Sequence, residues 1–167
     1  MDTAFVFNIV INVALGAALL LAWHRDRSQA FLRMVGLAFV VHAGLPLGFF
    51  VKESGGAVAA TVGLASLVLL AMLSFVLLGA GAAYLAERPP RRRQFLVAVP
   101  ALLLLGAVLV PLGDGPAMTV VVLMNLGVGL LACRWLWPRS PAERLSGVLL
   151  VLLTANHFQV LAFGPEV

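Results

Sequence analysis

Long apolar runs separated by short polar turns make up most of this chain. Six runs of 17 to 29 residues cover 4–22, 34–51, 57–85, 95–112, 117–133 and 145–163. A helix needs about 20 mainly apolar residues to cross a bilayer, and in hydrocarbon only helices or closed barrels pair every backbone group. Barrel strands alternate apolar and polar residues, and these runs do not. The pattern predicts an all-α polytopic membrane bundle of about six transmembrane helices, forming one domain over residues 1–167.

The composition points to lipid as the solvent for most of the chain. It is 62% hydrophobic and 11% charged, with a mean hydropathy of +1.08, whereas soluble domains have about 45–50% apolar and about 25% charged residues. The formal net charge of +4 does not indicate nucleic acid as a partner, because the arginines lie in short turns between apolar runs. The single cysteine, Cys133, excludes an intrachain disulfide.

The basic residues predict how the helices are oriented. Ten of the eleven fall in the first, third and fifth connections, at 23–33, 86–94 and 134–144. The positive-inside rule assigns these connections to the cytoplasm, so both termini are expected outside. All three tryptophans border these turns, as in an interfacial aromatic belt: Trp23, Trp135 and Trp137.

The charges beside the first run bear on whether it is retained. Asp2 precedes the run, and Arg25 and Arg27 follow it. A cleavable signal peptide has the opposite order, with positive charge before the apolar run. We therefore expect a retained first helix with its N-terminus outside.

Prolines and an arginine run add local detail. Pro46 and Pro100 fall inside apolar runs and predict kinks there. The run 91–93 consists of arginines and follows two prolines. Its simplest role is to fix topology, and contact with anionic lipid is the alternative.

Polar side chains within the runs are the candidate functional residues, because such groups are costly at membrane depth and face a bundle interior or a cavity. At about 1.5 Å per residue, four of them fall near one midplane slab. The candidate ligand-binding residues are Asn12, His42, Asn125, Asn156 and His157. Interhelical hydrogen bonding without any ligand is the simpler interpretation of these residues, since Asn and His commonly join membrane helices.

No catalytic residue is assigned. The runs hold no set of carboxylates with histidine, no serine beside a base, no phosphate-binding glycine loop and no lysine for a Schiff base. No metal and no cofactor is expected, because two histidines without Cys or carboxylate partners make a poor zinc site. Haem or metal ligation by His42 and His157 is an alternative supported only by that pair.

The layout resembles the MASE-like membrane-embedded N-terminal sensor modules of bacterial diguanylate cyclases and sensor kinases. The resemblance lies in a first run closing in WHRDR at 23–27, a second beginning after Arg33, and a long small-residue-rich third ending in YLAER at 84–88. It implies a bacterial inner membrane location, six to eight helices, and a cytoplasmic output domain in cyclic-di-GMP signalling. It carries over no binding residues.

These features lead us to expect a membrane sensory domain, not itself an enzyme, that binds a small apolar or amphipathic ligand or responds to the bilayer. Expected partners are membrane lipids, a small ligand, an output domain and a second copy of the chain. With both termini outside, an output domain requires a seventh helix, so we expect a fragment of a longer protein. A small transporter or channel subunit, and a structural assembly subunit, are the open alternatives.

Overall fold

The computed structural model describes residues 3–163, except for the side chains of residues 4, 5, 92, 95 and 153–163. Within that part the chain is entirely helical, with no strand. The helices are α1 (Thr3–Arg25), α2 (Ala30–His42), α3 (Leu45–Glu53), α4 (Ala57–Leu85), α5 (Arg92–Leu109), the short 3-10 helix η1 (Val110–Leu112), α6 (Asp114–Leu136) and α7 (Pro141–Phe163). The predicted all-α class is confirmed.

Four helical stretches are long and apolar enough to cross a bilayer. They are Val6–Arg25, Ala30–Glu53, Ala57–Leu85 and Asp114–Leu136. The fourth predicted run corresponds to a shorter apolar helix, Leu96–Leu112. The sixth corresponds to α7, of which the side chains beyond residue 152 lie outside the described part. The count of six spans therefore stays a prediction.

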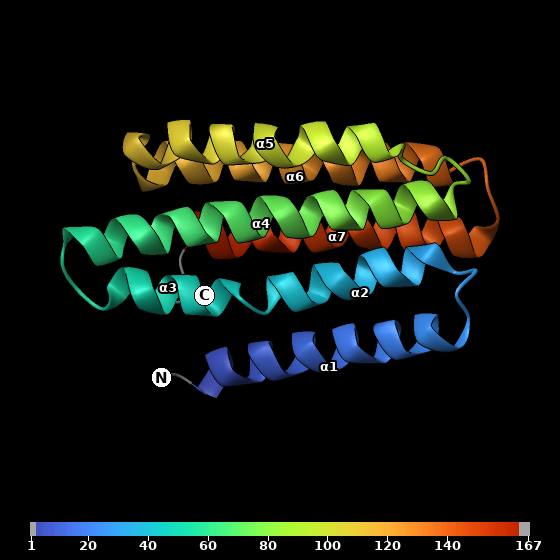
Figure 1. The fold of residues 1–167 in the computed structure, drawn as a ribbon, viewed down its shortest axis with the longest axis horizontal. Helices are drawn as coiled ribbons and strands as arrows, with labels where there is room; N and C mark the ends of the chain where they lie inside the picture. The colour runs from blue at the N-terminus through green and yellow to red at the C-terminus, as the bar shows by residue number, and fades with distance from the viewer. Residues whose placement is uncertain (1–2, 164–167) are drawn as a thin grey trace.

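Helix α4 is the centre of the bundle, and it contributes residues to each of the three clusters of buried hydrophobic side chains. It packs against α2 and α3 on one side and against α6 and α5 on the other, while α1 packs on α2 and α7 on α6 (Figure 1). Its sequence has no charged residue and many small ones, so neighbouring backbones can approach closely. The largest core cluster joins Leu64, Val68 and Met72 of α4 to Leu102 and Val121 of its neighbours.

The three basic turns lie at one end of the bundle. Figure 1 shows the connections α1–α2, α4–α5 and α6–α7 together on the right, and those after α3 and before α6 on the left. An ion pair joins connections at each end. Arg139 bonds Glu87 at the basic end, and Lys52 bonds Asp114 at the opposite end.

The second predicted run, 34–51, is broken rather than continuous. Helix α2 ends at His42, and α3 begins at Leu45 with Pro46 in its first turn. Proline has no N–H to give to the carbonyl four residues earlier, so the helical ladder is interrupted at this point. A kink was predicted at Pro46, and the chain has a break between two helices there instead; α5 continues as one helix through Pro100, where the predicted kink stays a prediction.

Candidate ligand groove

The C-terminus of α4 shapes one side of a groove at the basic end. The N–H of Arg88 donates to the carbonyl of Ala83 at 2.8 Å, and that of Glu87 donates to Tyr84 at 3.1 Å. This pair of bonds is a Schellman motif, in which glycine normally occupies the left-handed position. Here Glu87 occupies it, with φ of 56°. The motif turns the chain sharply and directs Arg88 across the end of the bundle.

Arg139, from the turn between α6 and α7, holds this cap in place. Its Nη1 donates to Glu87 Oε1 at 2.8 Å, and its Nη2 donates to the carbonyl of Ala86 at 2.7 Å. The Arg139 hydrogen bond and charge lower the pKa of Glu87 and keep it ionised. We call this contact between Arg139, Glu87 and Ala86 the clasp. It connects the end of α4 to the beginning of α7.

The start of α5 forms the other side of the groove. Pro89 and Pro90 make the connection from α4 stiff, because each fixes its own φ. Gln94 then caps the helix: its Oε1 accepts from the N–H of Arg91 at 2.6 Å, and its own N–H donates to the Arg91 carbonyl at 2.8 Å. Arg91 is thereby held at the first turn of α5, facing the end of α4.

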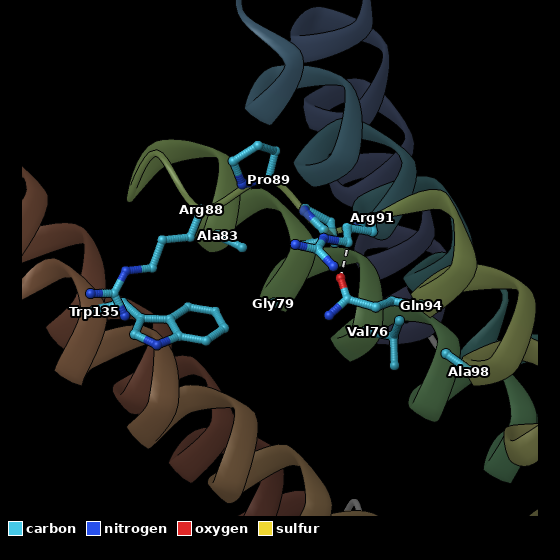
Figure 2. Close-up of a pocket in the computed structure, with 11 residues that line it drawn as sticks. Val76, Gly79, Ala83, Arg88, Pro89, Arg91, Gln94, Ala98 and Trp135 are labelled. Atoms are coloured by element: carbon cyan, nitrogen blue, oxygen red, sulfur yellow. Dashed lines mark hydrogen bonds between the residues drawn. The ribbon is translucent and has the colours of Figure 1, made fainter.

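Between these elements lies a groove with a volume of about 460 Å³ (Figure 2). Its inner wall consists of small and apolar residues, and its mouth is polar. Figure 2 shows Arg88, extended toward Trp135, and Arg91 on opposite sides of the mouth, with Gly79 between them. The lining residues are Val76, Gly79, Ala80, Ala83, Arg88, Pro89, Pro90, Arg91, Gln94, Ala98 and Trp135.

The groove exists because α5 packs on α4 along only part of its length. Leu102 and Leu109 are buried in the core cluster near the opposite end of the bundle. Toward the basic end, Leu96 and Val97 are 63% and 69% exposed. The only α4 side chains available there are small, so they leave space between the two helices. The described side chains of α4 and α5 therefore leave an open groove between the two helices.

The mouth of the groove is positively charged without a compensating carboxylate. No acidic residue lines it. Within the described part of the chain, neither Arg88 nor Arg91 forms an ion pair, because Glu87 is occupied by Arg139. Guanidinium groups only donate hydrogen bonds, up to five each. The mouth is thus suited to an anion, and the inner wall to hydrocarbon.

The first basic turn carries a second cationic cluster. Trp23 lies beneath two guanidiniums, with Arg27 at 4.1 Å and Arg33 at 5.3 Å from the ring centroid. Arg27 also donates to Nδ1 of His24 at 2.7 Å. The carboxylate of Asp26 accepts from Ser28 and Gln29 instead, and these hydrogen bonds lower its pKa.

Two of the sequence-predicted site residues are buried, but on helices that do not pack together. Asn12 of α1 is 8% exposed, and its Nδ2 donates to the carbonyl and side-chain oxygens of Asn8 at 2.8 and 2.9 Å. Asn125 of α6 is 2% exposed, and its Oδ1 has no hydrogen-bond partner among the described residues. Because α1 packs on α2 whereas α6 packs on α4 and α7, the structure does not bring these two side chains together.

The close helix contacts define the heights of these residues along the bundle. A Cβ placed on Gly16 would lie 2.7 Å from Val40, so Asn12, one turn earlier, lies level with the break after α2. His42, partly buried, ends α2 at the same height. The side chains of Asn156 and His157 lie outside the described part. Whether this set binds a ligand stays a prediction.

The cofactor expectation is likewise not settled by the structure. Among the residues searched, which are the described ones, no group of three or more His, Cys, Asp or Glu residues could hold a metal ion. One of the two histidines of the alternative haem or metal pair, His157, lies outside the described side chains. The absence of a cofactor stays an expectation from the sequence.

Sequence reasoning did not identify the groove residues. It assigned the arginines mainly to topology, with anionic lipid as an alternative role, and Trp135 to an aromatic belt. The available signal was the arrangement of two prolines and three arginines directly after a stretch of small residues in α4. What the sequence could not supply was the separation of α5 from α4.

No protein-family model, curated protein or solved structure matches this chain. The resemblance to MASE-like sensor modules therefore stays a prediction.

Proposed function

We propose that this chain is a membrane-embedded sensory module that takes an amphipathic ligand into the groove at its basic end. One observation carries the proposal: the apolar wall between α4 and α5 ends at two arginines that have no carboxylate partner in the described chain. Ligand sites are typically apolar concavities with a few polar groups that fix orientation. The MASE-like layout supports a role in signal input.

The orientation in the membrane belongs to the same proposal. Six helices cross the inner membrane of a bacterium, the basic end faces the cytoplasm, and both termini are outside. Four apolar spans and the gathering of the basic turns at one end of the bundle support this arrangement. A cytoplasmic output domain, acting in cyclic-di-GMP signalling, would follow a seventh membrane span, which would come after α7 in the chain.

The clasp offers a route from the groove to the last helix. Arg88 lines the groove and follows Glu87 directly, and Glu87 is bonded by Arg139 from the turn before α7. A ligand that bonds both Arg88 and Arg91 would favour the position of the α4 cap in which the two arginines lie closer together, over the position that the cap has without ligand. Such a ligand shifts the equilibrium only by its differential affinity for the two positions. The signal would then pass from α4 and α5 to α7.

A distance measurement tests the proposal. Spin labels on Arg93→Cys and Leu145→Cys, in a Cys133→Ser background, report the separation of α5 from α7 at the basic end. In neutral-lipid nanodiscs, a long-chain fatty acid, an alkyl phosphate and a neutral alkyl glucoside are added in turn. We expect at least one acidic amphiphile to shift the distance distribution. The shift should be smaller in the Ala98→Leu variant, in which the larger side chain narrows the groove.

The proposal fails if none of the three amphiphiles changes either the distance distribution or the thermal midpoint of the wild-type protein. It also fails if Ala98→Leu responds as the wild type does, because the response would then arise elsewhere. Arg93 and Leu145 are exposed and do not line the groove, so labelling them leaves the site intact.

A small transporter or channel subunit is the second candidate, and the broken span α2–α3 favours it. Transporters commonly place substrate sites at interrupted helices near the midplane. Here the buried Asn12 lies level with the interruption. Solute flux into proteoliposomes that is lost in Asn12→Leu, with the amphiphile response intact, would favour this candidate over the sensory one.

A further inference from the structure

The lining of the groove changes from apolar to cationic along the bundle axis. On α4 and the turn after it, the order is Val76, then Ala83, then Arg88; on α5, approached from the middle of the bundle, it is Ala98, then Gln94, then Arg91. The apolar part from Val76 to Ala83 rises about 10 Å at about 1.5 Å per residue. A soluble anion would leave this wall unused, and a simple hydrocarbon would leave the arginines unused.

The charge of the mouth selects among amphiphiles. Two guanidiniums flank the opening, and Glu87, which precedes Arg88 in the chain, is already bound by Arg139. Guanidinium groups bind phosphate through paired hydrogen bonds. A zwitterionic head group carries a positive group beside its phosphate, and the two arginines at this site would repel that positive group. An anionic phosphodiester therefore fits better than a zwitterionic one.

The groove also lies at the level of the membrane leaflet in which an anionic phospholipid would be found. It opens at the basic end, and α5 beside it exposes apolar side chains, with Leu96 63% and Val97 69% exposed. A lipid can thus enter sideways from the leaflet without crossing the bundle. The proline pair and the Gln94 cap fix the backbone at Arg91 before binding, which reduces the backbone entropy lost when the phosphate is bound.

We propose that the groove between α4 and α5 binds an anionic phospholipid from the leaflet at the basic end. Its phosphate lies between Arg88 and Arg91, and the upper part of one acyl chain lies along Val76, Gly79 and Ala83. This inference rests on the proposed sensory function and names its ligand class. The module would then respond to the anionic lipid content of that leaflet.

Native mass spectrometry of the full chain in a neutral detergent tests this ligand. Phosphatidylglycerol and phosphatidylcholine with identical acyl chains are titrated separately, and bound lipid is counted. We expect one phosphatidylglycerol to bind more tightly than phosphatidylcholine. The double variant Arg88→Gln/Arg91→Gln should weaken its binding by roughly tenfold to thirtyfold, as expected for two interfacial arginines.

Two further variants separate the groove from general charge attraction. Arg25→Gln/Arg134→Gln removes the same charge from exposed positions at the same end that do not line the groove, and it should bind phosphatidylglycerol like the wild type. Ala98→Leu keeps every arginine but narrows the groove, and it should bind the lipid more weakly than the wild type does. Circular dichroism and thermal unfolding confirm that each variant is folded.

Several results would overturn the lipid inference. Equal losses in the two double-arginine variants would indicate general charge attraction, and binding of glycerol phosphate as tightly as the lipid would indicate a phosphate site without an acyl chain. Absence of phosphatidylglycerol binding, together with a response to a fatty acid, would overturn this inference but leave the sensory function standing. Absence of any response to phosphatidylglycerol, fatty acid, alkyl phosphate or alkyl glucoside would overturn both.

Discussion

At the scale of single residues, the cap of α4 combines local strain with contacts that hold it. Glu87 has φ of 56°, a conformation that costs a residue with a Cβ about 1 kcal/mol and glycine almost nothing. Strained residues tend to occur at sites where the backbone moves or binds a ligand. The strain at Glu87 lies one residue from the groove, and the hydrogen bonds of Arg139 to Glu87 and Ala86 oppose its release.

The strain at this position predicts an order of stability among variants. Glu87→Gly removes the carboxylate and the strain, whereas Glu87→Gln removes only the charge. We expect the glycine variant to be more stable than the glutamine variant by about 1 kcal/mol. Thermal unfolding in detergent, followed by tryptophan fluorescence at neutral pH, measures the difference. Equal midpoints for the two variants would show that the left-handed conformation is not costly here.

At the scale of helices, close packing depends on particular glycines. Gly63 of α4 lies against α3, where an added Cβ would lie 2.4 Å from the backbone nitrogen of Lys52. Gly127 of α6 has nothing within 4 Å of such a Cβ. These two positions have the same chemistry but opposite surroundings, so they form a matched pair.

Alanine at the two positions should act in opposite directions. Gly63→Ala forces α3 away from α4 and should lower the free energy of unfolding by about 1–3 kcal/mol. Gly127→Ala should leave it unchanged or raise it by up to about 1 kcal/mol, because alanine favours the helix. Unfolding by sodium dodecyl sulfate, followed by circular dichroism, gives both values. Similar losses in both variants would contradict the packing of α3 on α4 described above.

The helices themselves were largely predictable, but their ends were not. The run 57–85 has the bounds of α4 because glycines precede it and a Schellman turn and two prolines follow it. In contrast, α1 extends past the predicted 4–22 to Arg25. Apolar runs identify residues suited to hydrocarbon, and polar residues at the interface can continue the same helix. The break before Pro46 was predictable as an interruption, because proline lacks the N–H.

At the scale of the whole molecule, the sequence predicts the height of a residue along the bundle axis better than it predicts which helices lie next to each other. Distance from a basic turn gives the height of Asn12 and Asn125, but it does not indicate which helices are neighbours. That depends on side-chain packing around α4, which separates α1 from α6. The groove was missed for the same reason. Its residues were recognisable as small, apolar or basic, but the gap between α4 and α5 arises from the packing of Leu102 and Leu109 elsewhere.

The grouping of the basic turns at one end of the bundle leads to a prediction about membrane topology. In a Cys133→Ser background, single cysteines replace Ser28, Pro89 and Pro138 at the basic end, and Ser54 at the other end. A membrane-impermeant maleimide should label Ser54→Cys in intact cells and the other three only after permeabilisation. The physical reason is that arginine-rich turns are retained on the cytoplasmic side, whereas the opposite end carries only a few charges. Labelling of any basic-end cysteine in intact cells would place that turn outside, and the leaflet assigned to the groove would then be wrong.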